Sequence, residues 1–171
     1  IATNKKKLYQ RLLLLRNLGS IKKHDHNLLG MNSRLDTIQA VVLNKKLKSI
    51  LKINQIRRKI AQIYDNKLKE FQDLKITKTK PGSTRHLYVI RTKKRDSLLK
   101  YLKRKKILCQ IHYPYSLNKL KPFIKVSKKS YLLKNSEKWA KECLSLPIHP
   151  RMRSSEVSQI FNEIKNFFTK R

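Results

Sequence analysis

Residues 30–40 read Gly-Met-Asn-Ser-Arg-Leu-Asp-Thr-Ile-Gln-Ala and set the organisation of the whole chain. Gly30 lets the backbone turn tightly, since glycine has no Cβ. Asn32 and Arg34 carry groups that donate hydrogen bonds to anions such as phosphate. Apolar residues at helical spacing begin at Leu35. The stretch is therefore predicted to be a polar loop that leads directly into a long helix.

The segment after this loop, residues 35–71, contains neither glycine nor proline. Its apolar residues recur mostly at helical spacing: Leu35, Ile38, Val42, Leu47, Ile50 or Leu51, Ile56, Ile60, Ile63, Tyr64, Leu68 and Phe71. A helix of about 35 residues would span roughly 50 Å at 1.5 Å per residue. Because that length exceeds a small core, we expect the helix to bend, to break or to bridge two domains.

The segment before the loop predicts a short helix and a polar connection. The helix is expected to run to about Leu15, and Gly19 is placed to end it. Residues 18–31 then read as a polar loop. This loop holds three ionisable side chains, those of His24, Asp25 and His26.

The segment beyond residue 75 alternates between strand and helix patterns, with a turn at Pro81-Gly82. The predicted elements are a strand at 86–91, a helix capped by Asp96 that runs to about Lys105, a strand at 107–112, a helix near 136–143, a short extended piece at 144–146 and a helix at 154–168. This order predicts a mixed α/β domain that begins near residue 75.

The charge of the chain is extreme, because 43 lysines and arginines face 10 acids and give a formal net charge of +33. Clustered basic residues bind polyanions through counterion release, so a nucleic acid is one candidate partner. The lysines are spread over the whole sequence, however, and neither zinc-finger spacing nor an aromatic RNA-binding signature accompanies them. We interpret the charge as a solvated surface enriched by AT-biased coding, with a nucleic-acid surface as the alternative.

The sequence gives little support for a metal site or for a membrane-spanning segment. Cys109 and Cys143 lack metal-ligand spacing and are expected to be reduced, packed thiols, so no metal site is predicted. No apolar run reaches the ~20 residues that cross a bilayer. A membrane partner is therefore not expected, and the cytoplasm is the predicted location.

Four segments taken together resemble one protein family. They are residues 30–40 and three further motifs: His86-Leu87-Tyr88-Val89-Ile90-Arg91, Ile111-His112-Tyr113-Pro114 and Leu144-Ser145-Leu146-Pro147-Ile148-His149-Pro150. The family is the DegT/DnrJ/EryC1/StrS group of sugar-nucleotide aminotransferases, which use pyridoxal 5'-phosphate (PLP). The resemblance runs from Ile1 to the C-terminus but covers only the C-terminal part of such an enzyme. It implies the α/β class of the fold-type I PLP-transferases, represented here by a long connecting helix and a small mixed α/β domain.

The resemblance implies that this chain holds part of a cofactor site. PLP catalysis needs a lysine Schiff base, an acid near the pyridine nitrogen, a ring-stacking group and a phosphate clamp. In the family, the asparagine of a Gly-x-Asn-x-Arg pattern reaches the cofactor phosphate of the neighbouring subunit. This assigns Asn32 to that phosphate, and assigns Arg34 to an anion or to holding the loop. Without the other motifs, Asn32, Ser33 and Asp36 also fit a simple helix start.

The Schiff-base lysine is expected upstream of Ile1, in a part of the enzyme that this chain does not include. None of the lysines here shows the features of such a residue, which needs a depressed pKa and a fixed position over the cofactor ring. No residue of the chain is predicted to be catalytic. We therefore expect the chain alone not to transaminate.

The resemblance also implies substrate contacts from two loops. His26 matches a loop histidine that the family often carries before the Gly-x-Asn turn. His112 and Tyr113 begin a segment that in relatives reads His-Tyr-Pro-x-Pro-Leu-His and borders the sugar-nucleotide pocket. In this chain Ser116 and Asn118 replace the second proline and the final histidine. The segment is therefore less rigid and has lost one imidazole.

These expectations combine into a domain plan and a function. Residues 1–34 are assigned to the end of the large cofactor domain and its active-site loop, 35–74 to the connecting helix and 75–171 to the small domain. The parent enzyme would transfer an amino group, with glutamate as the expected donor, to a keto-sugar nucleotide for polysaccharide synthesis. It would act as a homodimer with shared active sites. A basic nucleic-acid-binding protein and a non-catalytic remnant of the fold are the alternatives, and dehydratase and regulatory members of the family also stay open.

Overall fold

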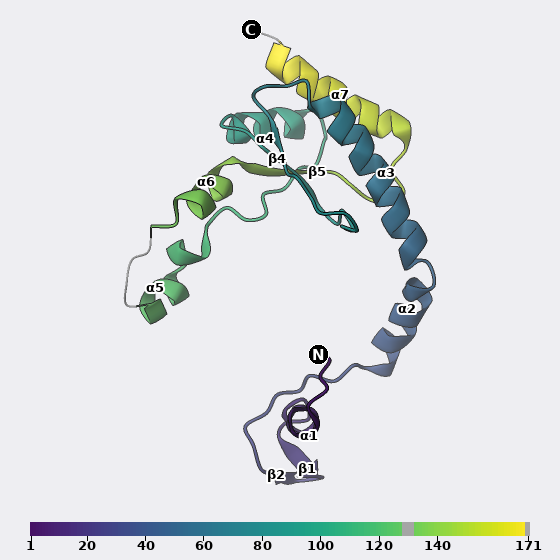
Figure 1. The fold of residues 1–171 in the computed structure, drawn as a ribbon, viewed down its shortest axis with the longest axis vertical. Helices are drawn as coiled ribbons and strands as arrows, with labels where there is room; N and C mark the ends of the chain where they lie inside the picture. Colours follow the sequence, from purple (N-terminus) through teal and green to yellow (C-terminus); the bar gives the residue numbers. More distant parts are fainter. Residues whose placement is uncertain (128–131, 170–171) are drawn as a thin grey trace. The chain divides into compact units, whose positions relative to one another are not determined.

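The computed structural model describes residues 1–127 and 132–169. Contacts divide the chain into two compact units, Ile1–Ile50 (unit 1) and Leu51–Arg171 (unit 2), which we describe separately. The elements, labelled in Figure 1, are α1 (Lys6–Leu15), β1 (Ser20–Lys22), β2 (Asp25–His26), α2 (Thr37–Leu47), α3 (Ile50–Leu68), β3 (Lys75–Ile76), β4 (Tyr88–Arg91), α4 (Arg95–Arg104), η1 (Leu117–Lys119), α5 (Lys121–Ser127), α6 (Lys134–Glu142), β5 (Cys143–Leu146) and α7 (Ser154–Thr169).

Unit 1 contains a small β-hairpin within the segment that was predicted to be a polar loop. β1 pairs with β2 in antiparallel fashion, with Ser20 opposite His26 and Lys22 opposite Asp25. The sequence did not indicate these strands because residues 20–26 lack the alternation of apolar and polar side chains that marks a half-buried strand.

Two glycines of unit 1 allow backbone segments to approach each other closely. Gly19 has φ +73°, and a Cβ at this position would lie 1.7 Å from the carbonyl oxygen of Leu28. A Cβ on Gly30 would lie 2.2 Å from the backbone nitrogen of Gly19 and 2.7 Å from the carbonyl oxygen of Leu15. Gly30 is thus required by this close approach, since a side chain there would overlap the opposing backbone.

The segment expected to form one long helix contains two helices, α2 and α3. The chain turns between them at Lys48 and Ser49. Both the backbone nitrogen and the hydroxyl of Ser49 donate to the carbonyl oxygen of Lys46, each at 3.1 Å. Such local hydrogen bonds give the backbone an alternative to continuing the helix. This is one reason why serine is unfavourable in helix interiors. A break was among the expected outcomes, and the division between the two units falls at the same place.

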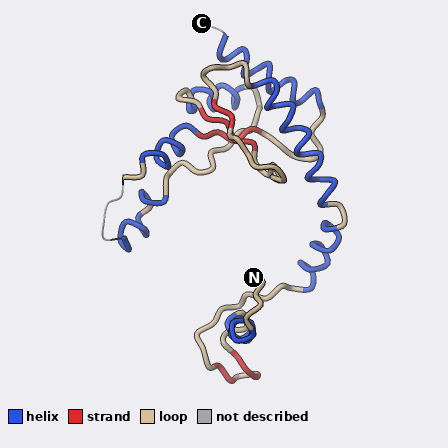
Figure 2. Tube along the Cα trace, viewed as in Figure 1, coloured by secondary structure: helices blue, strands red, loops and turns tan. Residues whose placement is uncertain are grey.

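Unit 2 is a mixed α/β fold built on a three-stranded antiparallel sheet, in the order β3-β4-β5. Figure 2 shows these strands in red among the helices of the unit. Tyr88 on β4 faces Leu146 on β5, and Arg91 faces Cys143. All four residues of β5 are buried. The predicted strands at 86–91 and 144–146 are therefore confirmed with bounds shifted by one or two residues at their starts, and the α/β class of this domain is confirmed.

The strand predicted at 107–112 is wrong. Only Gln110 bridges to the sheet, where its backbone exchanges two hydrogen bonds with that of Ser145 on β5, at 3.2 and 2.8 Å. The apolar composition of the segment reflects packing instead, since Ile107 is buried and Ile111 lies against the core.

The N-cap of α4 lies two positions before the predicted cap, Asp96. Lys94 is the N-cap, and Asp96 lies inside the first turn, where its carboxylate contacts Arg95 Nε at 2.6 Å. An acid in the first turn is still favourable because the helix dipole is positive at its N-terminal end.

The C-terminal helix α7 begins at the predicted residue, Ser154, and ends one residue beyond the predicted end at 168. Arg153 donates its backbone N–H to the Glu156 carboxylate at 2.7 Å, an arrangement that matches half of a capping box. This hydrogen bond is the main cause that lowers the Glu156 pKa. Val157, Ile160 and Ile164 are buried on the predicted apolar face.

The hydrophobic core lies in unit 2. Its largest fully buried side chains include Tyr64, Tyr88, Leu98, Leu144 and Ile164, from α3, β4, α4, β5 and α7 respectively. α4 contacts both β5 and α7, and Figure 1 shows these helices beside the sheet. A stripe of apolar residues from each element thus meets in one core.

Polar contacts add to this packing by tying α3 to the chain that follows β5. Tyr64 donates its hydroxyl to the Pro147 carbonyl at 3.0 Å, and Arg57 donates to the Ile148 carbonyl at 3.0 Å. The segment beyond the sheet is therefore held against α3 by side-chain donors as well as by apolar contact.

Candidate functional site

The predicted site residues lie in two groups, one in each unit. His26, Asn32 and Arg34 belong to unit 1, whereas His112 and Tyr113 belong to unit 2. Each group is brought together by its own local structure.

The loop that carries Asn32 is held against the chain that follows α1. Asn32 forms an isolated antiparallel bridge with Asn17. On either side of it, Leu18 donates its backbone N–H to Met31 at 3.2 Å, and Ser33 donates to Arg16 at 2.9 Å. The backbone around Asn32 is therefore fixed by hydrogen bonds although its side chain is exposed.

Arg34 is anchored to the same backbone segment. Its guanidinium donates a hydrogen bond to the side-chain oxygen of Asn17. This contact matches one of the two predicted roles for Arg34, namely holding the loop. Arginine carries five N–H donors, so further donors can serve an anion.

His26 lies near Arg34. Its Nδ1 is 3.0 Å from the Leu18 carbonyl oxygen, which makes that nitrogen a donor to the carbonyl. His26 and Arg34 line one hollow of about 450 Å³ together with Asn17 and His24. The structure thus brings His26 and Arg34 together beside the loop that carries Asn32.

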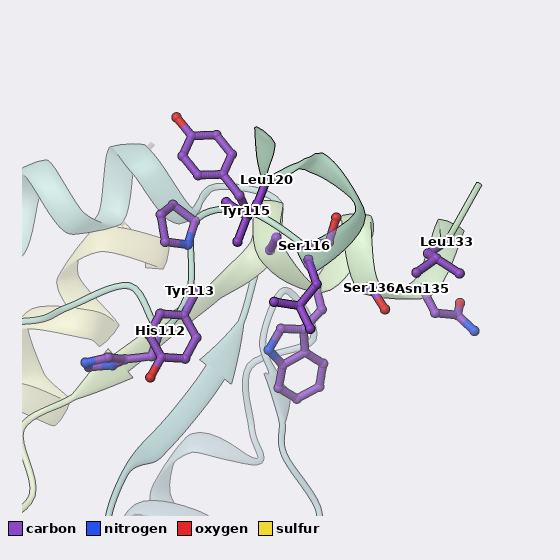
Figure 3. A pocket seen from close by; sticks show the side chains of 12 residues that line it. His112, Tyr113, Tyr115, Ser116, Leu120, Leu133, Asn135 and Ser136 are labelled. Carbon is purple, nitrogen blue, oxygen red and sulfur yellow. The ribbon is translucent and has the colours of Figure 1, made fainter. Parts of the chain in front are cut away.

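A larger pocket in unit 2 is bordered by His112 and Tyr113. Its volume is about 800 Å³. Figure 3 shows His112 and Tyr113 at one end and Leu133 and Asn135 at the other. The apolar residues of the lining include Tyr113, Tyr115, Leu117, Leu120, Leu133 and Trp139. A mainly apolar pocket with a few polar groups is typical of small-molecule sites.

His112 is positioned by the buried strand β5. Its Nδ1 lies 2.9 Å from the hydroxyl oxygen of Ser145, whose side chain points off β5. The thiol of Cys143 lies 3.8 Å from the carbonyl oxygens of both His112 and Tyr113. Because Ser145 and Cys143 are buried in the sheet, the start of the His-Tyr-Pro segment rests on a rigid base.

Asn118, which replaces a family histidine, is bonded to α6. It donates to the Glu137 carboxylate at 2.9 Å, and Lys119 lies 3.5 Å from the same carboxylate. The hydrogen bond from Asn118 is the main cause that lowers the Glu137 pKa. Asn118 therefore connects the His-Tyr-Pro segment to the helix on the other side of the pocket.

Sequence reasoning missed two residues that build these sites. Asn17 supports both Asn32 and Arg34, and the signal was its place in an Arg-Asn pair just before Gly19. Trp139 lines the unit 2 pocket, and the signal was its spacing of three residues from Ser136, which lines the same pocket.

Residues 1–127 and 132–169, which the structure describes, show neither a metal cluster nor a membrane-spanning helix. They contain no group of three or more His, Cys, Asp or Glu side chains placed to hold a metal ion. In the same residues no helix is both long and apolar enough to cross a bilayer. Cys109 and Cys143 are free thiols.

The chain is similar to proteins of one known family. Residues 1–165 match the DegT/DnrJ/EryC1/StrS aminotransferase family. The chain is 36% identical over 168 residues to the dTDP-3-amino-3,6-dideoxy-alpha-D-galactopyranose transaminase of Aneurinibacillus thermoaerophilus, covering 98% of this chain and 46% of that protein. It is 34% identical over 172 residues to a pleiotropic regulatory protein of Geobacillus stearothermophilus, with the same coverage of 98% and 46%.

A solved structure shows the same architecture. The crystal structure of S. venezuelae DesV in complex with a ketimine intermediate superposes with a TM-score of 0.90 at 29% identity, over 99% of this chain and 46% of that one. The chain thus spans about half the length of the relatives it matches, and it corresponds to their C-terminal half. These likenesses favour the predicted aminotransferase fold over a nucleic-acid-binding protein. From the motifs, the fold and the match over residues 1–165, the chain belongs to the DegT/DnrJ/EryC1/StrS aminotransferase family.

Proposed function

We propose that this chain is the C-terminal half of a PLP-dependent aminotransferase that acts on a keto-sugar nucleotide, with glutamate as the amino donor. The observation that carries the proposal is the construction of the Asn32 loop. Asn17 bridges Asn32 and accepts a hydrogen bond from Arg34, so the loop presents two exposed donors on a fixed backbone. This arrangement suits the family role of the loop, contact with the cofactor phosphate of a neighbouring subunit.

The side chains at this loop fit a phosphate group. Asn32 and Arg34 are both exposed, and an amide and a guanidinium are hydrogen-bond donors. PLP, when bound, supplies the electron sink for amino transfer. The residues of this chain would hold its phosphate and thereby orient the ring, while the Schiff-base lysine is assigned to the half of the enzyme that this chain does not span.

The pocket in unit 2 supports a role in substrate binding. We assign Tyr113 and His112 to the sugar nucleotide because they border a pocket of about 800 Å³. The imidazole of His112 is oriented by Ser145 through its Nδ1. His26 is assigned separately to a substrate contact at the hollow in unit 1, which Arg34 also lines.

The proposed role of Asn32 requires an active site shared by two subunits. If Asn32 serves the phosphate of a neighbouring subunit, two copies of the enzyme must associate, so we assign a homodimer. We place the enzyme in the cytoplasm and in a pathway of polysaccharide synthesis. The regulatory name of one relative makes a member without transaminase activity the competing assignment.

The test is reconstitution with the missing half. The 171-residue chain would be combined with the N-terminal half of the A. thermoaerophilus transaminase, and PLP affinity and amino transfer from glutamate would be measured. We expect Asn32→Ala to weaken PLP binding by about tenfold, the value of one hydrogen bond to a charged group. Asn27→Ala is the matched control, since Asn27 is exposed in the same unit and bonds Gly19 only through its backbone N–H. Equal losses for the two variants would contradict the role of Asn32.

A further inference from the structure

The helix α2 of unit 1 is rich in apolar side chains, yet none of its residues is buried. Ile38 is 80% exposed, Val41 63% and Leu47 67%. By contrast, α4 and α7 of unit 2 each bury three residues. Large apolar side chains at these exposures are normal singly but not in a group along one helix.

The apolar residues of α2 occupy more than one side of the helix. Ile38 and Val42 are four residues apart and share one side, and Leu43 and Leu47 share another. At 3.6 residues per turn, Leu43 lies well over a quarter turn from Ile38. A helix that is apolar on several sides is characteristically a buried helix rather than a surface one.

α2 is also too short and too poorly capped to be stable as an isolated helix. It has 11 residues, and its N-cap Asp36 makes no side-chain capping bond. Isolated helices shorter than ~12–15 residues are marginal in water, so most helices in proteins depend on tertiary packing. Among residues 1–50 only Gly19 is buried, and it has no side chain. Unit 1 therefore has no core of its own against which α2 could pack.

The length of the relatives indicates what covers this helix. DesV matches 99% of this chain at a TM-score of 0.90, but the match takes up only 46% of DesV. The same architecture is thus embedded there in a chain more than twice as long. A second copy of this chain is a poorer occupant, because it would bring only another unit 1 without a core and would not supply the rest of the fold that DesV contains.

We propose that α2 is an interface helix that packs into the complementary, N-terminal half of an aminotransferase of this family. Ile38 and Val42 would enter that half on one side of α2, and Leu43 and Leu47 on another. The inference rests on the proposed function only in naming the occupant, since the exposed apolar surface does not depend on the cofactor role of Asn32.

Hydrogen exchange tests the proposal. In the 171-residue chain alone, we expect the α2 amides to exchange at nearly unprotected rates while the unit 2 core is protected. Adding excess N-terminal half of the A. thermoaerophilus transaminase should slow exchange in α2 by at least about tenfold. Protection of α2 in the chain alone, whether the chain is monomeric or self-associated, would overturn the proposal. Unchanged exchange after addition of the complementary half would overturn it too.

Paired variants locate the interface. Ile38→Asp should weaken binding of the complementary half by about tenfold or more, because it places a charge in an apolar contact. Asn44→Asp adds a charge to the same helix at a polar position and should change binding by less than about threefold. Asn32→Ala should leave both binding and α2 protection unchanged. Loss of PLP binding in Asn32→Ala, with α2 still protected, therefore bears on the proposed function alone, whereas equal effects of Ile38→Asp and Asn44→Asp would refute the interface.

Discussion

The two units of this chain are stabilised in different ways. Unit 2 contains every buried apolar side chain in the described residues, gathered around a three-stranded sheet. Unit 1 buries only Gly19, and it is held by backbone hydrogen bonds between the segments that flank its hairpin. Burial of apolar surface is the main stabilising term in folding, so unit 2 can be stable by itself and unit 1 has little stability of its own. The part of the molecule that carries the Asn32 loop is thus the part that lacks a hydrophobic core.

The largest expected difference is between core substitutions in the two units. Leu144→Ala, at a fully buried position on β5, should lower the free energy of unfolding by about 2–5 kcal/mol, since it removes apolar contacts and leaves a cavity. Leu43→Ala makes the same change on α2, where the side chain is 53% exposed, and should cost within about 0.5 kcal/mol. Urea unfolding followed by circular dichroism measures both values.

If Leu144→Ala and Leu43→Ala lowered the free energy of unfolding by similar amounts, the two units would not differ in the way described. Such a result would show that α2 is already packed in the chain alone, and that unit 1 has a core.

A smaller effect is expected from adding one methyl group to unit 1. Gly30→Ala would place a Cβ 2.2 Å from the Gly19 nitrogen, so the backbone segments must separate. We expect exchange of the amides of Asn27 and Met31, which bond Gly19 and Leu15, to rise by at least about tenfold, equivalent to about 1.4 kcal/mol. The unfolding midpoint of unit 2 should not move.

The control for Gly30→Ala is Gly82→Ala in unit 2. Gly82 has φ +84° but nothing lies within 4 Å of an added Cβ, so only backbone strain of about 1–2 kcal/mol is expected, confined to its own turn. If Gly30→Ala leaves the exchange of Asn27 and Met31 as slow as before, the close approach of the two segments does not hold the loop.

The smallest expected effect is the pH dependence of a thiol in unit 2. Burial raises the pKa of Cys109 from its ordinary value of 9.0 to about 12. Well below pH 9 the thiol is protonated in both the folded and the unfolded chain, so it adds no pH dependence. Above pH 9 the unfolded chain loses this proton first, and the free energy of unfolding falls as pH rises.

Alkylation by iodoacetamide, followed residue by residue with mass spectrometry, measures this protection. At pH 9 Cys109 should react at least about tenfold more slowly in the native chain than in urea, because the thiolate is the reactive form. Equal alkylation rates of Cys109 in the native chain and in urea would show that water reaches this side of the unit 2 core. The difference in side-chain burial between the two units would then be smaller than described.

Long periodic segments could be predicted from the sequence, and short or irregular ones could not. The face of α7 that holds Val157 and Ile160 is buried as its helical spacing indicated. The hairpin of β1 and β2 and the single bridge at Gln110 were missed, because two or three paired residues leave no periodic pattern to detect. The cap of α4 was predicted at Asp96, two positions beyond the observed cap Lys94, because acidic residues are favoured in the first turn as well as at the cap.

The site residues also divide into those that could be predicted from the sequence and those that could not. Asn32 and His112 were recognisable because they stand in short motifs with fixed spacing. Their supports were not recognisable, because Asn17 and Ser145 lie 15 and 33 residues away in the sequence and meet them only in the folded chain. A contact of this kind depends on the register of paired backbone segments, which local sequence does not specify.

The sequence by itself determined the α/β class, the helices with strong apolar periodicity and the family, because these depend on residue type and spacing along the chain. The tertiary structure alone decided where the long helical segment breaks, that Asn17 holds Asn32 and Arg34, and that β5 orients His112. It also decided that one unit has a core and the other does not. The physical reason is that burial is a property of all the segments that meet at one place, so the apolar residues of α2 and of α7 look alike in sequence and differ only in what packs against them.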